Sequence, residues 1–477
     1  MENNRQVYLL DPHEFSPETI AVTFAKTSRS HQSYIQIASE LNESKSAEFN
    51  EKWVVGYGHS SVAEHAVLHI AVENISRLAC ECLESNRLAS YTEKSTRYQT
   101  WNADAFYIPA EIQGALLSQY IDLCHFLLNT YQTIIPPVVT QLAKMNPAVP
   151  AETPSAWERR IRSAAIDSCR FLLPSAALAN VGMTINARAL EHALVKMLSH
   201  PLAEVRQIGV EIKSCAVASI PTLLKYAEAD ESLIAATAPV QSPELSAAAP
   251  DRDWCRLVFA EPDAEDRILA AYLFRQQSIS YAQSMNLVKN ASTSDKAQWV
   301  ALMLASSNPH SIPLRELEHA NFTFEITLDQ GAYYEVKRHR MLTLTPQPLT
   351  PYLGYALPKA IIDSGQAGEF SAAMSKADQL YRKIAEQTSP AASYIIPNAF
   401  NRRFLLSANL RSLLHFIQLR SAPNAHFSVR RLAQSLAQQL STALPAFAPS
   451  LPTHPLESVS SIESTFFSET MKEGSDD

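Results

Sequence analysis

The sequence predicts a helix-rich α+β protein built from two tandem repeats, and three observations support this. Four blocks occur twice, in the same order, on either side of a stretch rich in Ala, Pro and Ser. One pair of blocks alternates apolar and polar residues, as half-buried strands do. Only 10 of the 477 residues are glycine, against a usual share of about 7%. This favours long helices over glycine-rich phosphate loops, and neither G-x-G-x-x-G nor a Walker motif occurs.

The first pair of blocks predicts a short strand, an acidic turn with proline and a helix; it reads VYLLDPHEFSPETIAVTFAKTSRS and CRLVFAEPDAEDRILAAYLFRQQSIS. The second pair, AEHAVLHIAVENI and LEHANFTFEITLD, predicts a strand, with His65 and His319 at matching places. The third pair is expected on a helix and carries SNRLASYTEKSTRY and RHRMLTLTPQPLTPY. The fourth pair contains ALANVGMTINARALEHALVKML and AFNRRFLLSANLRSLLHFIQLR. Four matched blocks in one order indicate a tandem duplication.

The domain boundaries follow from composition. The stretch AATAPVQSPELSAAAP, residues 235–250, lacks helical periodicity and is interpreted as a linker. It separates a first repeat, residues 1–234, from a second, residues 251–444. The duplicated unit is about 220–240 residues, within the usual range for one domain. The tail, residues 445–477, is Pro/Ser-rich and ends in KEGSDD, so we expect it to be disordered.

Bulk properties exclude several classes of protein. The net charge is −8 and the pI is near 6.0, without a basic block, which disfavours nucleic acid as a partner. No apolar run reaches about 18 residues, and the start MENNRQVYLL lacks the features of a secretion signal. The six cysteines form no C-x-x-C pair, which favours buried free thiols in a reducing cytoplasm. The order E-H-x-x-x-H around His65 and His69 lies in a predicted strand, so no metal site is expected.

The segment EKSTRY predicts a binding site for a nucleoside monophosphate. Glu93, Ser95 and Arg97 stand at alternate positions, so in an extended loop they face one side. A guanidinium can contact a phosphate through two hydrogen bonds, and a hydroxyl and backbone N–H groups can complete the site. The alternative is a solvated loop with a Glu–Arg surface pair.

A second group of polar residues comes from the second half. Arg338, His339 and Arg340 are consecutive, so on a helix they point about 100° apart. At a helix end they could surround a large anionic ligand, or they could instead balance the helix dipole. In NLRSLLHFIQLR, Asn409 and Arg420 are three turns apart on one face. A lone Arg at the end of such a helix is more often a surface residue.

These blocks resemble the flavin-dependent thymidylate synthases. That family carries R-H-R-x-x-S-x-N-E-x-S-x-R-Y, preceded by G-H-x-(S/T)-x-x-E-H and followed by N-x-R-x-L-x-(H/N)-F-x-x-x-R. The first half supplies GHSSVAEH, SNRLASYTEKSTRY and NARALEHALVKML, and the second half supplies RHRMLT and NLRSLLHFIQLR. The resemblance implies two tandem copies of the family's α+β fold, an antiparallel sheet with long helices. It also implies reductive methylation of dUMP to dTMP, with FAD, methylenetetrahydrofolate and NADPH.

The resemblance also assigns residues, by position in this chain. For the substrate dUMP these are Glu93, Ser95, Arg97, Arg170 and Arg420, with Arg420 and Ser95 as the catalytic pair. Arg420 would stabilise negative charge on the pyrimidine ring. For FAD they are His59, Ser61, Arg338, His339, Arg340, Asn409, Arg411 and His415.

The departures from the family pattern differ between the repeats. The first half has Ser85 and Asn86 for the first two residues of R-H-R, and Lys196 and Met197 where the late helix should end in Arg. The second half keeps R-H-R, but its nucleotide loop has Pro346 for Glu, Pro348 for Ser and Thr350 for Arg. Prolines fix φ and lack an N–H donor, so this loop cannot reproduce a phosphate site.

These losses are complementary, because the family builds each active site across protomers of a homotetramer. One composite site would combine the nucleotide loop of the first repeat with R-H-R and the late helix of the second. A homodimer of the fused chain would then be equivalent to the tetramer. Two substitutions oppose this: Glu335 stands for a Gln of the family, and Ser393 for an Arg. The alternative function is a non-catalytic or retasked nucleotide- or flavin-binding protein.

Overall fold

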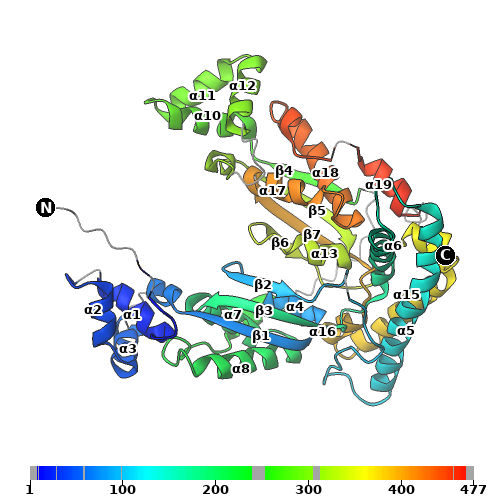
Figure 1. Ribbon diagram of the computed structural model, residues 1–477, viewed down its shortest axis with the longest axis horizontal. Coiled ribbons are helices and arrows are strands. Elements are labelled where there is room, and N and C mark those ends of the chain that lie inside the picture. The colour runs from blue at the N-terminus through cyan, green and yellow to red at the C-terminus, as the bar shows by residue number, and fades with distance from the viewer. Residues whose placement is uncertain are drawn as a thin grey trace.

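The structure is a computed structural model. It describes residues 8, 10–27, 30–56, 60–97, 99–238, 253–304, 312–454 and 456–468. Two antiparallel sheets, one from each half of the chain, are joined through a set of long helices that draws on both halves. Figure 1 shows α5, α6 and α15 standing together on one side of the two sheets.

The first repeat contains one three-stranded sheet and a small helical unit at its N-terminus. Its strands are β1 (Val67–Ser76), β2 (Ala89–Glu93) and β3 (Leu178–Asn186). Its helices are α1 (Pro17–Thr27), α2 (Tyr34–Glu40), α3 (Glu43–Phe49), α4 (Arg77–Leu83), α5 (Gly114–Met145), α6 (Pro154–Cys169), α7 (Ala187–Leu198), α8 (Ala203–Val217) and α9 (Glu231–Thr237). Short turns of 3-10 or π helix are η1 (Asn50–Gly56), η2 (Ser60–His65) and η3 (Arg170–Leu172).

Within the described residues, the second repeat keeps the strand order of the first and adds a strand at its start and a short helix before its long helix. Its strands are β4 (Cys255–Ala260), β5 (Asn321–Asp329), β6 (Thr343–Pro346) and β7 (Asn401–Asn409). Its helices are α10 (Ala264–Gln276), α11 (Tyr281–Asn290), α12 (Thr293–Leu304), α13 (Gln330–Val336), α14 (Lys359–Asp363), α15 (Ala367–Ala385), α16 (Ser389–Ala392), α17 (Leu410–Arg420), α18 (Phe427–Ala443) and α19 (Val459–Phe466). Its 3-10 turns are η4 (Arg315–Glu318), η5 (Ser393–Ile395) and η6 (Ala448–Ser450).

Strand register confirms the duplication. The sheet orders are β1-β3-β2 and β4-β5-β7-β6, so β1, β3 and β2 correspond to β5, β7 and β6. Both sheets pair their central and first strands through matched asparagines, in one case Val67 with Asn186 and in the other Asn321 with Asn409. Each asparagine then caps the next helix through its side chain. Glu93 and Pro346 occupy the same place, at the ends of β2 and β6.

The two repeats are packed against each other at equivalent turns. Pro174 and Pro397, the prolines of the LLP and IIP turns, face each other across an antiparallel bridge. Backbone bonds flank it on both sides, including Ser175 N–H to the Ile396 carbonyl, 2.9 Å, and Asn398 N–H to the Leu173 carbonyl, 2.9 Å. Equivalent residues that pair in this way imply a pseudo-twofold axis at the bridge. One hydrophobic core continues across it, because α5 packs on α15.

The structure differs from several local predictions. Arg338, His339 and Arg340 follow the end of α13 in a turn, not on a helix. Of the strand predicted for VYLL, only Tyr8 and Leu10 are described, and neither lies in a strand. Helix α9 extends to Thr237, into the predicted linker, and residues 239–250 lie outside the described part of the chain.

The prediction that the tail is disordered from residue 445 is wrong as far as Ser468. This segment forms η6 and α19, and it buries Ile462 and Phe467, which are 1% and 5% exposed. Ile462, Phe466 and Phe467 dock α19 on Phe427 of α18 and its surroundings, and Phe447 earlier in the segment is fully buried as well. Residues 469–477 lie outside the described part.

Candidate functional site

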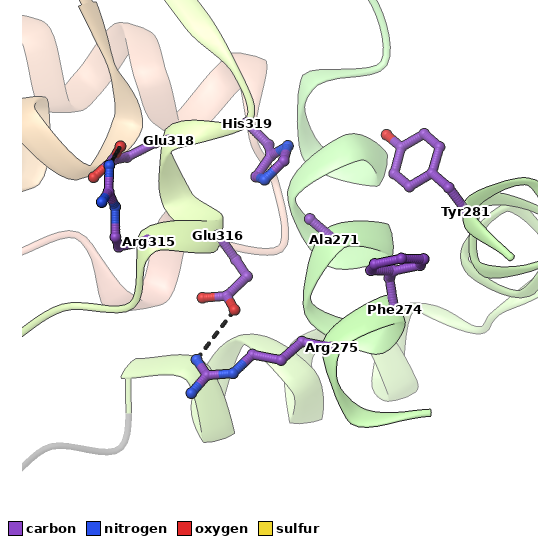
Figure 2. A pocket seen from close by; sticks show the side chains of 8 residues that line it. All are labelled: Ala271, Phe274, Arg275, Tyr281, Arg315, Glu316, Glu318 and His319. Carbon is purple, nitrogen blue, oxygen red and sulfur yellow. Dashed lines mark hydrogen bonds and ion pairs between the residues drawn. The ribbon is translucent and has the colours of Figure 1, made fainter. Parts of the chain in front are cut away.

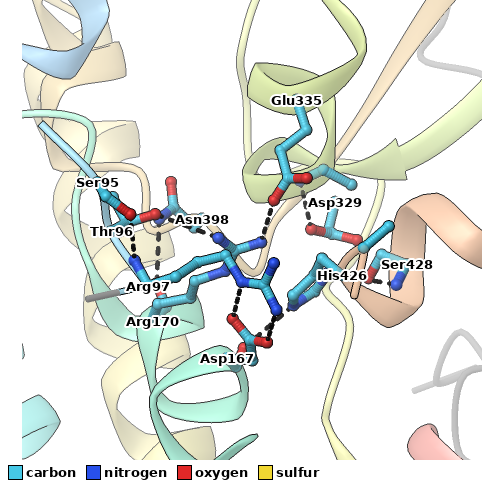
Figure 3. A network of polar contacts seen from close by, with 12 residues as sticks. Ser95, Thr96, Arg97, Asp167, Arg170, Asp329, Glu335, Asn398, His426 and Ser428 are labelled. Atoms are coloured by element: carbon cyan, nitrogen blue, oxygen red, sulfur yellow. Dashed lines mark hydrogen bonds and ion pairs between the residues drawn. The ribbon is translucent and has the colours of Figure 1, made fainter. Parts of the chain in front are cut away.

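The predicted nucleotide loop of the first repeat and the R-H-R turn of the second meet at the interface between the repeats. The first repeat contributes β2 with the loop after it, the start of α4, and the junction of α6 with η3. The second repeat contributes the end of α13, the end of α17 and the start of α18. Figure 3 shows the part of this group around Arg97, Arg170 and Glu335. The interface cluster, as we call it, comprises Arg77, Glu93, Ser95, Arg97, Asp167, Arg170, Glu335, Arg338, His339, Arg420 and His426.

Glu93 joins the two repeats at the end of β2. One carboxylate oxygen lies 3.0 Å from Arg77 of α4, and the other lies 2.8 Å from Arg338 of the R-H-R turn. Burial alone would raise the pKa of Glu93, but the charges of Arg77 and Arg338 outweigh it and lower the pKa. The Arg338 side chain is 45% exposed, so it also presents its cation to solvent.

Arg97 is held by a carboxylate of its own repeat. Asp167, in the last turn of α6, accepts from Arg97 Nε at 2.8 Å and from Nη2 at 2.7 Å. The two side chains therefore form a bidentate ion pair. Nη1 donates to the Asn424 carbonyl of the second repeat at 2.7 Å, and the Arg97 N–H donates to Ser95 Oγ at 3.2 Å. Burial acts to raise the pKa of Asp167, and the charges of the nearby arginines lower it below its ordinary value.

Glu335 lies between two arginines, one from each repeat. Arg170 Nη2 donates to its Oε1 at 2.7 Å, and Arg420 Nη1 donates to its Oε2 at 3.3 Å. The second donor group of Arg170, Nη1, reaches Thr96 Oγ1 at 3.1 Å. Burial alone would raise the pKa of Glu335, but the cation of Arg170, with Arg420 behind it, lowers the pKa to about 2. This carboxylate is therefore charged at neutral pH.

Two histidines of the cluster are neutral. His339 accepts from Arg420 Nε at its Nε2, 2.8 Å, with Phe416 packed edge-on 4.7 Å from its ring. Burial, followed by the charge of Arg420, lowers the pKa of His339 to about 3. His426 caps α18, where its Nδ1 accepts from the Ser428 N–H at 3.2 Å, and burial lowers its pKa to about 3. A neutral ring that accepts at Nδ1 carries its proton on Nε2, which lies 3.2 Å from the Asp167 carbonyl.

The structure brings together most, but not all, of the predicted site residues. Glu93, Ser95, Arg97, Arg170, Arg338, His339 and Arg420 lie in the interface cluster. Arg340 borders it, and its Nη1 donates to the Arg87 carbonyl at 2.8 Å. His415 lies on α17, and its ring centre is 6.0 Å from that of His339. Sequence reasoning missed Arg77, Asp167 and His426.

Three predicted cofactor residues, Ser61, Asn409 and Arg411, lie away from the cluster and its border, and a fourth, His59, is not described. The Asn409 side chain is used as the N-cap of α17, where it accepts from the Ser412 N–H at 2.9 Å. Arg411 pairs with Glu318 at 2.8 Å and donates to the Pro313 carbonyl at 3.1 Å. Ser61 lies in η2, which precedes β1, whereas Arg77 of the cluster follows the other end of that strand. His59 lies outside the described residues.

A separate surface cavity of about 420 Å³ lies between α10 and η4 (Figure 2). Its lining residues are Ala271, Phe274, Arg275, Tyr281, Arg315, Glu316, Glu318 and His319. Glu318, the partner of Arg411, is one of them, and Arg275 pairs with Glu316 at 3.1 Å. Arg411 therefore pairs with a residue that lines this cavity, Glu318, and not with a residue of the interface cluster.

The chemistry of the exposed donors fits an anionic cofactor such as FAD. Arg338 of the R-H-R turn is 45% exposed, Arg340 of the same turn is partly exposed, and His415 beside it is exposed. Guanidinium groups in this setting suit a pyrophosphate. In the deeper part of the cluster, the buried Nε of Arg170 has no hydrogen-bond partner within the described chain.

The opposite combination would join the R-H-R position and late helix of the first repeat to the nucleotide loop of the second. The side chains at these equivalent positions are different. Met197 stands at the place of Arg420 and carries no charge, while the preceding residue, Lys196 of α7, donates to Ser85 Oγ and, at 2.8 Å, to Asn86 Oδ1. Burial lowers the pKa of Lys196. In the second repeat, Ser393 stands at the place of Arg170 and its hydroxyl donates to the Leu349 carbonyl at 3.0 Å. Thr350 has the place of Arg97, so this region lacks counterparts of both Arg97 and Arg170.

Within the described ranges, no group of three or more His, Cys, Asp or Glu side chains could hold a metal ion. Across the same residues, no helix combines the length and the apolar character that a membrane span requires.

The fold and the cluster thus define a duplicated α+β protein with a polar site between its two halves. The family model for the thymidylate synthase complementing protein matches residues 10–222 and again residues 256–446. The chain belongs to this family. The two matches, together with the two equivalent sheets, confirm the predicted resemblance and the tandem repeat.

Relatives of two kinds are similar to the chain. A UPF0159 protein of Chlamydia muridarum is 33% identical over 439 residues, which is 86% of this chain and 81% of the relative. A flavin-dependent thymidylate synthase of Geobacter sulfurreducens is 26% identical over 220 residues, 45% of this chain and 84% of the relative. Among solved structures, the UMP/dUMP methylase PolB from Streptomyces cacaoi bound with 5-Br dUMP is 14% identical with a TM-score of 0.34, covering 42% of this chain and 96% of its own.

Proposed function

We propose that the chain is an FAD-dependent enzyme that converts dUMP to dTMP, with one active site per chain at the interface cluster. The observation that carries this proposal is the meeting of Arg97 and Arg170 from one repeat with Arg338 and Arg420 from the other. Each repeat alone lacks half of this set. A site of this kind accounts for the opposite losses in the two repeats.

Different residues of the cluster would contact the phosphate and the base of the substrate. Arg97 and Ser95 would bind the 5′-phosphate, because Asp167 already fixes the Arg97 guanidinium and Ser95 stands beside its N–H. Arg420 would stabilise negative charge on the pyrimidine ring, and its Nε bond to neutral His339 holds it in place. Glu93 would set the position of Arg338 at the border between nucleotide and cofactor.

Arg338, Arg340, His339 and His415 would hold FAD, which, when reduced by NADPH, supplies a hydride. A methylene group from methylenetetrahydrofolate would pass to C5 of the base, and the C5 proton would leave to solvent. Addition of the hydride completes the methyl group, and tetrahydrofolate is released. No cysteine nucleophile is required, and burial raises the pKa of Cys80, Cys82, Cys124, Cys169 and Cys255.

We also propose that the fused chain forms a homodimer and acts in the cytoplasm. The dimer would place four repeats together, which is the number in the family's tetramer. The six cysteines are free thiols in the structure, five of them buried or half-buried. Unpaired thiols in this number are typical of a reducing compartment.

The direct test is release of tritium from dUMP labelled at C5, measured with purified protein, FAD, NADPH and methylenetetrahydrofolate. We expect release that depends on all of these components, together with dTMP of matching amount. Bound flavin without tritium release would instead support the second candidate function.

That second candidate is a nucleotide- or flavin-binding protein without this activity. A specific observation favours it: Asp167 and Glu335 already neutralise Arg97, Arg170 and Arg420. Binding of dUMP and FAD, without turnover at any concentration of folate or NADPH, would identify this case.

A further inference from the structure

The carboxylate of Glu335 occupies the space where two arginines of different repeats converge. Its two oxygens lie 2.7 Å from Arg170 Nη2 and 3.3 Å from Arg420 Nη1. The Arg420 Nη2 group also reaches the Glu335 carbonyl, at 3.4 Å. The exposed fractions of the Arg170, Glu335 and Arg420 side chains are 4%, 9% and 20%. The carboxylate is therefore an internal anion, largely shielded from water.

Most of the remaining donors of the two arginines are also engaged, although the buried Nε of Arg170 has no hydrogen-bond partner within the described chain. Arg170 Nη1 donates to Thr96 Oγ1, and Arg420 Nε donates to His339 Nε2. A phosphate that approached this pair would meet Glu335 at a distance of a few Å. Two like charges about 4 Å apart repel strongly wherever water is largely excluded. A dianion would feel this repulsion twice over, whereas an uncharged 5′-hydroxyl would not feel it.

We propose that Glu335 is a specificity-determining residue that neutralises Arg170 and Arg420 in place of a bound anion. It lowers the affinity of the interface cluster for a phosphate dianion, so that dUMP binds less tightly than it would with an uncharged residue at this position. The inference rests on the proposed function for the identity of the base, but not for the effect on phosphate. The low pKa of Glu335 agrees with it, since the carboxylate stays charged at neutral pH.

The test compares the full-length wild type with Glu335→Gln. The amide keeps the size of the side chain and its ability to accept from Arg170, but removes the negative charge. Glu325→Gln is the matched control, because Glu325 of β5 also lies between two arginines, Arg256 at 3.0 Å and Arg403 at 3.5 Å, outside the cluster. Calorimetry measures binding of inorganic phosphate, dUMP and deoxyuridine to all three proteins.

We expect Glu335→Gln to bind dUMP at least tenfold more tightly than the wild type does, and to gain affinity for inorganic phosphate. Its affinity for deoxyuridine should stay within about twofold, and Glu325→Gln should match the wild type for every ligand. Equal or weaker binding of both dUMP and phosphate by Glu335→Gln would overturn the proposal. So would a tenfold gain that extends to deoxyuridine, because the effect would then not concern the phosphate.

Thermal unfolding distinguishes a change in phosphate binding from a folding defect. Glu335→Gln leaves buried Arg170 without its counter-charge, so its melting temperature should fall, and phosphate should restore more of it than in the wild type. A lowered melting temperature that phosphate does not raise would contradict the proposal. If the phosphate effects are as expected but no dTMP forms, Glu335 keeps its assigned role and the proposed function fails alone.

Discussion

Arg97 is the residue whose role in the nucleotide loop is most open to direct test. Replacing it with Ala removes a charge-assisted contact to phosphate, so we expect dUMP binding to weaken by about 2–3 kcal/mol. Thr350, its counterpart in the second repeat, should give no change when replaced with Ala. Calorimetry with dUMP measures both, and equal effects of the two substitutions would refute the asymmetry between the repeats.

The same residue also stabilises the fold, so its two effects must be separated. Arg97→Ala leaves Asp167 buried, 10% exposed, without the partner that it contacts twice. The double variant Arg97→Ala, Asp167→Asn removes the stranded charge. It should recover stability in denaturant unfolding but should not recover affinity for dUMP.

The lowered pKa of Glu335 implies that the stability of the fold depends on pH. Its pKa is about 2 in the folded chain and about 4.3 when unfolded. A carboxyl with a depressed folded pKa stabilises the fold above its unfolded pKa, and this stabilisation is lost as pH falls from about 4.3 towards 2. The difference in unfolding free energy between wild type and Glu335→Gln should therefore shrink below about pH 4.5. A difference that stays constant from pH 7 to 3 would rule this out.

The sequence predicted those site residues that lie in motifs with fixed spacing, and it missed those that reach the cluster only through the fold. Arg77 reaches Glu93 because α4 begins directly after β1, and β2 of the same sheet ends at Glu93. Asp167 and His426 are 259 positions apart and meet only because the repeats pack on each other. A charged residue in the apolar run AAIDSCRFLL was the one available signal for Asp167.

At the scale of elements, alternation of apolar and polar residues predicted β1 and β5 well. The expectation of a helix at Arg338–Arg340 was wrong, because α13 ends at Val336. The lesson is that a helical period cannot locate the last residue of a short helix. Nor could composition show that three apolar residues would dock the C-terminal segment.

That docked segment gives a further prediction. Phe467 is 5% exposed and packs edge-on against Phe427, 5.2 Å between ring centres. Phe467→Ala should lower the unfolding free energy by about 3 kcal/mol, because a buried aromatic ring is replaced by a cavity. Leu456 is 85% exposed, so Leu456→Ala should change it by less than about 0.5 kcal/mol. Similar values in chemical denaturation would mean that α19 is not docked in solution.

At the scale of the whole molecule, fusion of two repeats allows each to specialise. Residues that serve the nucleotide can remain in one repeat and residues that serve the cofactor in the other, provided that the interface holds them together. The pseudo-twofold pairing at Pro174 and Pro397 supplies that interface. The sequence predicted the duplication and the opposite losses, while the internal neutralisation of the arginines required the structure.

The same view predicts an assembly of two fused chains. Sedimentation velocity at micromolar concentration should show a species of twice the chain mass of 52.8 kDa. A stable monomer over that range would contradict the dimer, although it would leave the composite site within one chain untouched.

The stoichiometry of flavin tests the composite site most directly. Absorbance of the flavin against protein concentration should give one FAD per chain, because only the second repeat keeps R-H-R. The double variant Arg338→Ala, Arg340→Ala should lose nearly all flavin, since two cations are removed together. Arg188→Ala, in the first repeat at the place of Arg411 and paired with Glu64, should keep it. Two flavins per chain would show that both combinations of elements form sites, and no flavin at all would remove the basis for the proposed enzyme.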